Sequence, residues 1–163
     1  MYQEVWQHLE EVFREDPSML EHTRRVFDFA HDIAQALKLD AVTQRTVHLA
    51  ALLHDVGIVE AEKKFGSREG KFQHITGPPI ARRILEEIGE QPQVVERVLY
   101  LVGNHHNFDK VDGIDFQVLV EADMLVNLEE EKLASDELRS FIEGFFKTAP
   151  GLRTAKRKYL KEI

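Results

Sequence analysis

The 163-residue sequence contains no cysteine, few prolines and glycines, and a single tryptophan. Without cysteine there is no disulfide, no thiolate ligand and no thiol nucleophile, so a bound metal must use nitrogen and oxygen ligands. A chain of this kind is typical of the cytoplasm. No apolar run approaches membrane-spanning length, and the N-terminus lacks the basic start and apolar stretch of a signal peptide. We therefore expect a soluble cytoplasmic protein without a membrane partner.

Positively charged residues are fewer than negatively charged ones. The sequence has 21 Lys and Arg and 29 Asp and Glu, which gives a formal net charge of −8. Such a surface repels the phosphates of duplex nucleic acid and of anionic lipid. Local basic patches still allow a small anion to bind, so the expected partner is a small molecule.

Apolar residues recur at helical spacing throughout, and strand-like alternation is almost absent. The pattern predicts an all-α fold in a single domain covering residues 1–163. The polar, glycine-containing segment 59–73 is predicted to be a surface loop. The predicted helices are 2–14, 18–38, 41–55, 77–88, 92–106, 115–130, 136–147 and 152–161.

The last two of these helices, within residues 136–161, are expected to pack on the rest of the domain. Their apolar set is wide enough for core packing, and a homodimer contact is the alternative use of it. The set comprises Leu138, Phe141, Ile142, Phe145 and Phe146.

The apolar stripe of each helix separates buried histidines from exposed ones. His22 lies one turn before the stripe of its helix, and His54 and His105 continue the stripes of theirs. In contrast, His31 and His48 fall beside the stripes and are predicted to point outward.

Two further positions belong to this inward set. His74 shares the face of the apolar residues that follow it, provided that its helix starts early enough. Asp123 occupies a position between Leu119 and Val126 that a leucine would normally fill. Asp55 follows His54 directly, at a helix end where consecutive side chains can converge.

Burying four histidines and two aspartates without a common partner would cost several kcal/mol for each group. A metal centre removes that cost. Imidazole nitrogen and carboxylate oxygen without sulfur suit Fe or Mn, and also Zn, Co or Ni, and one aspartate can bridge two ions through its two oxygens.

The order His22, His54-Asp55, His74, His105-His106, Asp123 resembles the HD-domain superfamily of metal-dependent phosphohydrolases, in its two-metal form. The segments ALLHDVG and VEADML are similar to the family's AALLHDIGK and ADML, and the resemblance covers about residues 18–130. It implies a helical bundle with one or two divalent ions in its core. The implied ligands are His22, His54, Asp55 and Asp123 for one ion, and Asp55, His74 and His105 for the other, with His106 as a further candidate.

Two features depart from the family pattern. Many members have lysine after HD-x-G, where this chain has Ile58. The Gly-Tyr-Pro element of members that cleave cyclic dinucleotides is absent after His106, which argues against that substrate. Arg25, which resembles the arginine of the family's H-x-x-R-V, is the preferred residue to hold a substrate phosphate, followed by Lys110. Basic residues of the 59–73 segment are weaker candidates: Lys63, Lys64, Arg68 and Lys71.

The resemblance implies hydrolysis of a phosphate ester or anhydride, of a nucleotide or related small molecule, by a hydroxide held between the ions. Asp55 would bridge the ions, and His106 would be a ligand, a proton donor or a supporting residue. Two alternatives stay open: a di-iron enzyme of the HD type that activates oxygen, which uses the same ligands, and a non-catalytic module in which metal holds the helices together.

Overall fold

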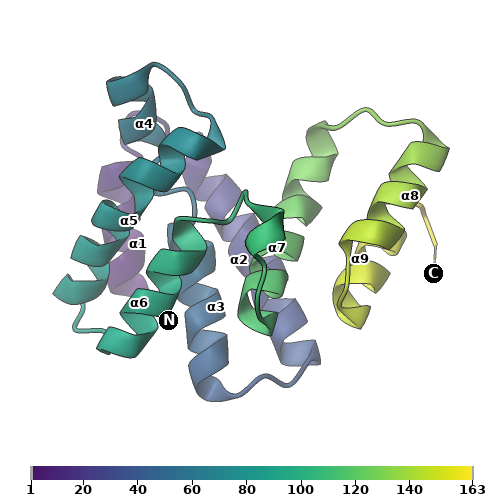
Figure 1. Ribbon diagram of the computed structural model, residues 1–163, viewed down its shortest axis with the longest axis horizontal. Helices are drawn as coiled ribbons and strands as arrows, with labels where there is room; N and C mark the ends of the chain where they lie inside the picture. The colour runs from purple at the N-terminus through teal and green to yellow at the C-terminus, as the bar shows by residue number, and fades with distance from the viewer. Residues whose placement is uncertain (1, 163) are drawn as a thin grey trace.

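The computed structural model describes residues 2–162, and over that range it is helical and contains no β-strand, as the sequence predicts (Figure 1). None of its helices is long and apolar enough to cross a membrane. Two short 3-10 helices, η1 at Phe108–Lys110 and η2 at Leu128–Glu130, flank α7. The α-helices are α1 Gln3–Val12, α2 Ser18–Ala36, α3 Ala41–Leu53, α4 Ile58–Phe65, α5 Gly70–Glu87, α6 Pro92–Val102, α7 Ile114–Asn127, α8 Ser135–Phe145 and α9 Ala149–Tyr159.

Helix α3 forms the centre of the bundle and packs against α2, α6 and α7. Asp40 caps its start by accepting a hydrogen bond from the backbone N–H of Thr43 at 2.8 Å. Every residue from Thr46 to Leu53 is buried, so this helix has no exposed face in its second half. The prediction that His48 points outward is therefore wrong, because the side chain is only 4% exposed. His31 is partly buried and lies against His48, with a 3.0 Å contact between ring nitrogens.

The segment 59–73 is not the predicted loop. It contains most of α4 and the first turn of α5, and only the stretch between them is irregular. Helix α4 buries just Ile58 and Ala61 and exposes its charged side chains, so its apolar stripe was too narrow to stand out in the sequence.

Helix α5 begins at Gly70, before the start predicted near residue 77, and it continues through Pro78 and Pro79. Proline removes a backbone donor and normally disrupts a helix interior, which is why the sequence indicated a start here. A tertiary contact holds this part of the helix: Oγ1 of Thr76 donates a hydrogen bond to the carbonyl of Gly57 at 2.7 Å. The backbones approach so closely that a Cβ added at Gly57 would lie 2.4 Å from the nitrogen of Gly77.

Helices α8 and α9 form a layer beside α7, at one end of the bundle (Figure 1). Ile142 and Phe146 are buried, and Leu138, Phe141 and Phe145 are partly buried and pack against the core. The layer is tied to α7 by Glu121, whose side chain is fully buried. This carboxylate accepts hydrogen bonds from the backbone N–H groups of Lys147 and Thr148, at 2.9 and 3.1 Å, and from Oγ1 of Thr148 at 2.6 Å.

Candidate metal centre

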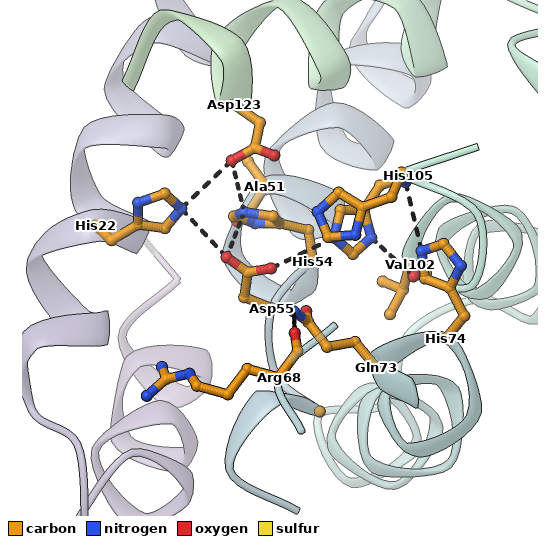
Figure 2. Close-up of polar contacts among 12 residues, drawn as sticks. His22, Ala51, His54, Asp55, Arg68, Gln73, His74, Val102, His105 and Asp123 are labelled. Carbon is orange, nitrogen blue, oxygen red and sulfur yellow. Dashed lines mark hydrogen bonds and ion pairs between the residues drawn. The ribbon is translucent and has the colours of Figure 1, made fainter. Parts of the chain in front are cut away.

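A first group of donors comes from α2, the end of α3, and α7. The group consists of His22, His54, Asp55 and Asp123, each offering one ligand atom within 4.8 Å of the others. Nε2 of His22 lies 3.2 Å from Oδ2 of Asp55 and 3.3 Å from Oδ1 of Asp123. Nε2 of His54 faces the same two oxygens at 3.1 and 3.3 Å (Figure 2).

A second group consists of three histidines: His74 from α5, and His105 and His106 from the turn after α6. Their ring nitrogens also lie within 4.8 Å of one another. Nε2 of His105 is 3.3 Å from Oδ1 of Asp55, so this carboxylate faces both groups. The structure thus brings together the six positions of the predicted constellation, and it places His106 with His74 and His105.

Both pairs of adjacent site residues lie just beyond the helices rather than within them, because α3 ends at Leu53 and α6 at Val102. At each end a histidine ring turns back on its own helix. Nδ1 of His54 contacts the carbonyl of Ala51 at 2.7 Å, and Nδ1 of His105 contacts that of Val102 at 2.9 Å. Since a carbonyl only accepts, each Nδ1 carries a hydrogen, and Nε2 is the ring atom directed at the site.

These Nε2 atoms face the carboxylate oxygens of Asp55 and Asp123. Within the described residues, Nε2 of His54, Nε2 of His105 and Oδ1 of Asp123 are buried without a hydrogen-bond partner. Buried acceptors that face one another are unfavourable unless a cation lies between them. The donor set therefore fits a divalent transition metal, because such an ion bonds to imidazole nitrogen and carboxylate oxygen. The carbonyls of Ala51 and Val102, which contact Nδ1 of His54 and His105, help to orient these two rings as ligands.

In the first group, carboxylates and imidazoles shift one another's pKa values in opposite directions. Burial by itself lowers the pKa of His22, but the adjacent carboxylates of Asp123 and Asp55 raise the pKa to about 9. Burial raises the pKa of Asp55 and Asp123, but His54 and the other adjacent imidazoles outweigh it and hold both pKa values below the usual range. The two aspartates are consequently ionised and available to a cation at neutral pH.

In the second group, the pKa values of His74 and His106 are lowered. Burial, together with the neighbouring ring of His105, lowers the pKa of both His74 and His106 to about 4. These two rings are neutral at pH 7, the form in which imidazole binds a metal.

His106 is held at close range by α5. A Cβ added at Gly70 would lie only 2.4 Å from Nδ1 of His106, so the ring occupies the space that a larger residue would need. The backbone N–H of His106 in turn lies 3.4 Å from Nε2 of His74. Gly70 thereby sets the distance between α5 and the turn that bears the His105-His106 pair.

A pocket of about 430 Å³ opens over the donors, lined by His22, Asp55, His106 and Asp123. Sequence reasoning missed several of its other residues. Asn127 lies four residues after Asp123, on the same helical face, and this spacing was a usable signal. Gln73 is 5% exposed and donates to the carbonyl of Arg68, but nothing in its sequence context marked it. The remaining lining residues are Ser18, Met19, Ile58, Arg68 and Glu130.

The structure does not bring Arg25 or Lys110 to this pocket. The guanidinium of Arg25 binds both carboxylate oxygens of Glu129, which also pairs with Lys158 at 2.9 Å. Lys110 is exposed on η1. Neither side chain lines the pocket over the donors, which is contrary to the expectation that they hold the substrate phosphate.

Among the basic candidates of residues 59–73, only Arg68 lines the pocket. Its guanidinium contacts Asp16 at 2.7 Å and Glu62 at 3.4 Å. Ile58, at the position where many relatives carry lysine, also lines the pocket and presents an apolar surface to it. The mouth of the site therefore carries little positive charge.

The fold and the two donor groups define an all-α domain whose core can hold metal ions. The sequence profile of the HD domain matches residues 19–139, most of the chain, and the chain belongs to the HD domain family. One similar solved structure is the "Crystal structure of predicted HD superfamily hydrolase" from an uncultured Thermotogales bacterium. It has a TM-score of 0.72 and 24% identity, over 98% of this chain and 85% of that chain, a likeness that shows the fold. A comparison with curated proteins found no match.

Proposed function

We propose that the protein is a metal-dependent phosphohydrolase that cleaves a phosphate ester or anhydride of a nucleotide or related small molecule in the cytoplasm. The family relation supports a metal-dependent hydrolase. The observation that carries the proposal further is the position of Asp55 between the two donor groups, 3.2 Å from His22 and 3.3 Å from His105. Two adjacent ions that share a carboxylate are a recurrent arrangement for phosphoryl chemistry.

In this proposal His22, His54, Asp55 and Asp123 hold one ion, and Asp55, His74 and His105 hold the other. Ions held by these residues would lower the pKa of a bound water and would neutralise charge on a phosphoryl group. The backbone carbonyls of Ala51 and Val102 keep the rings of His54 and His105 in the orientation that presents Nε2.

His106 lines the pocket and belongs to the second donor group. A proton donor for the leaving group must carry a proton at the working pH, but burial and the ring of His105 lower the pKa of His106 to about 4. The neutral ring favours a role as metal ligand. Arg68 is the residue we assign to the substrate phosphate, because among the described arginines and lysines it is the one that lines the pocket.

Phosphate release is the direct test. Purified protein is incubated with a panel of nucleoside mono-, di- and triphosphates and sugar phosphates, with Mn²⁺ or Fe²⁺, in air and under nitrogen. We expect metal-dependent phosphate release at the same rate in both atmospheres. Asp55→Asn should abolish it, whereas His8→Gln, a change in a histidine paired with Glu87 outside the site, should leave it unchanged.

A second candidate is a di-iron enzyme that uses oxygen to oxidise an organic substrate. The observation that favours it is the low positive charge of the pocket, where Ile58 is apolar and Arg68 is already bound to two carboxylates. Loss of substrate in air but not under nitrogen, without phosphate release, would replace the phosphohydrolase proposal with this one. Metal-dependent stability without turnover of any substrate would contradict both and favour a non-catalytic module.

A further inference from the structure

A second cavity, of about 440 Å³, lies between the end of α1, the turn after Asp55, α4 and α5. It shares no lining residue with the pocket over the donors. The hydrogen bond from Thr76 to the carbonyl of Gly57 lies between the two cavities. Thr76 and Val56, the residue before Gly57, line this cavity, whereas Asp55 lines the pocket over the donors. The proposed reaction makes no use of it.

The wall of this cavity is mainly apolar and includes Val12, Val56, Val59 and Ile80. Apolar surface also extends to its edge, where Ile75 is 59% exposed. A concave apolar surface of this size, open to solvent, suits the body of a small ligand. Burial of apolar ligand surface would supply most of the binding free energy.

The edge of the cavity is cationic. Lys63, Lys64 and Arg83 line it, against a single carboxylate, that of Glu60. Lys63 pairs with Glu15 at 2.9 Å and Lys64 with Glu60 at 3.5 Å. Arg83 is exposed and forms no ion pair with any residue from 2 to 162, in contrast to the neighbouring Arg82, which pairs with Glu96 at 2.9 Å. Arg83 therefore presents an uncompensated positive charge beside an apolar wall.

We propose that this cavity is a binding site for an amphipathic monoanion, with a medium-length alkyl or aryl body against Val59 and Ile80 and a carboxylate at Arg83. The apolar wall selects for the body and the guanidinium selects for the head group. The site is independent of the metal centre and of the reaction proposed for it.

Calorimetric titration of the full-length protein with decanoate tests the site, and two probes separate its requirements. 1-Decanol keeps the body without the charge, and butyrate keeps the carboxylate, including any affinity for bound metal, without the body. We expect saturable binding of one decanoate per chain, about two- to fivefold weaker binding of decanol, as for loss of one exposed ion pair, and no measurable binding of butyrate.

Variants locate the binding. Arg83→Ala should weaken the binding of decanoate about two- to fivefold and leave the binding of decanol unchanged. Arg82→Ala, on the same helix but outside the cavity, should match the wild type. Ile75→Asp, at an exposed position, should weaken decanoate through repulsion and loss of apolar contact. The proposal is overturned by non-saturable binding, by equal affinity for decanoate and decanol, or by equal effects of the two arginine variants.

Discussion

Oδ1 of Asp55 lies 3.3 Å from Nε2 of His105, the residue that connects this carboxylate to the second donor group. The other oxygen, Oδ2, faces His22 and His54 at 3.2 and 3.1 Å. Asp123 differs, because its ionic contacts within residues 2–162 are with His22 and His54 and none reaches the second group. The two aspartates therefore make separable contributions to the site.

Asp55→Asn should reduce the metal content to one ion or none per chain, because an amide offers only one neutral acceptor oxygen and cannot bridge. Asp123→Asn should lose the first ion and retain the second. Elemental analysis of protein dialysed against a low concentration of Mn²⁺ measures both. Two ions bound by Asp55→Asn with wild-type affinity would contradict the bridging role.

Removal of metal should destabilise the fold, because the buried acceptors of His54, His105 and Asp123 would lose their common partner. At a free metal concentration about 100 times the dissociation constant, binding stabilises the native state by about 2.7 kcal/mol. For a chain of this size that corresponds to about 5–10 °C in Tm. Thermal unfolding with a chelator and then with added Mn²⁺ gives the measurement, and an unchanged Tm would contradict the metal centre.

Helical phase was enough to predict which site residues converge, because α2 and α6 each bury one face. His22 and His105 could be placed by counting from their apolar neighbours. Helix α7 is buried on all sides from residue 118 to 123, so Asp123 lies inside whichever face it occupies. The same rule failed for His48, since both faces of the second half of α3 are covered. In a helix that is packed on several sides, no polar face marks the solvent side, so the sequence does not show which side chains point outward.

The parts that could not be predicted depend on contacts between distant segments. Helix α5 continues through Pro78 and Pro79, and the hydrogen bond from Thr76 to the carbonyl of Gly57, nineteen residues earlier, supports it there. Arg25 follows His22 by one turn, yet its guanidinium binds Glu129, 104 residues later in the sequence, and does not line the pocket. Spacing along one helix contains no information about such partners.

Gly70→Ala should weaken metal binding by the second group more than it affects stability. The added Cβ would meet Nδ1 of His106 at 2.4 Å, and the imidazole, as the end of a side chain, can rotate away at little cost to the fold. Displacing a ring that supports or forms the ligand set should cost about 10–100-fold in metal affinity. Isothermal titration with Mn²⁺ measures the affinity, and metal-free melting measures the stability.

Gly144→Ala is the matched control for that substitution. No heavy atom lies within 4 Å of a Cβ added there, in the exposed part of α8. The change should stabilise the protein by about 0.5–1 kcal/mol through helix propensity and leave metal affinity unchanged. An equal loss of metal affinity in both variants would show that Gly70 has no specific role beside His106.

Glu121→Gln should loosen the α8–α9 layer. The carboxylate accepts bonds from Lys147 and Thr148, and an amide would place a donor against those donors. We expect a loss of about 1–3 kcal/mol in the free energy of unfolding, as for a buried group left unpaired. Urea denaturation measures it, with the exposed Glu143→Gln as the control. Equal stability of the two variants would contradict the role of Glu121 as the link to α7.

His48 should make the fold sensitive to acid independently of the metal centre. Burial, followed by the nearby charges of His31 and Arg45, lowers the pKa of His48 from its ordinary 6.5 to about 4, while Oη of Tyr2 lies 2.8 Å from its Nδ1. The unfolded chain therefore takes up a proton at this position before the native state does. Stability from the neutral ring is complete above pH 6.5 and is lost as the pH falls towards 4.

At about 1.4 kcal/mol per pKa unit, the loss amounts to up to about 3 kcal/mol. His48→Gln removes this titration, so its stability should decline less than that of the wild type between pH 6.5 and 4, although it starts lower at pH 7.5 through weaker contacts with Tyr2 and His31. Urea denaturation of metal-free protein at several pH values gives the comparison, and His8→Gln should follow the wild type. Parallel declines for the wild type and His48→Gln would place the acid sensitivity elsewhere, with His74 and His106 as the next residues to test.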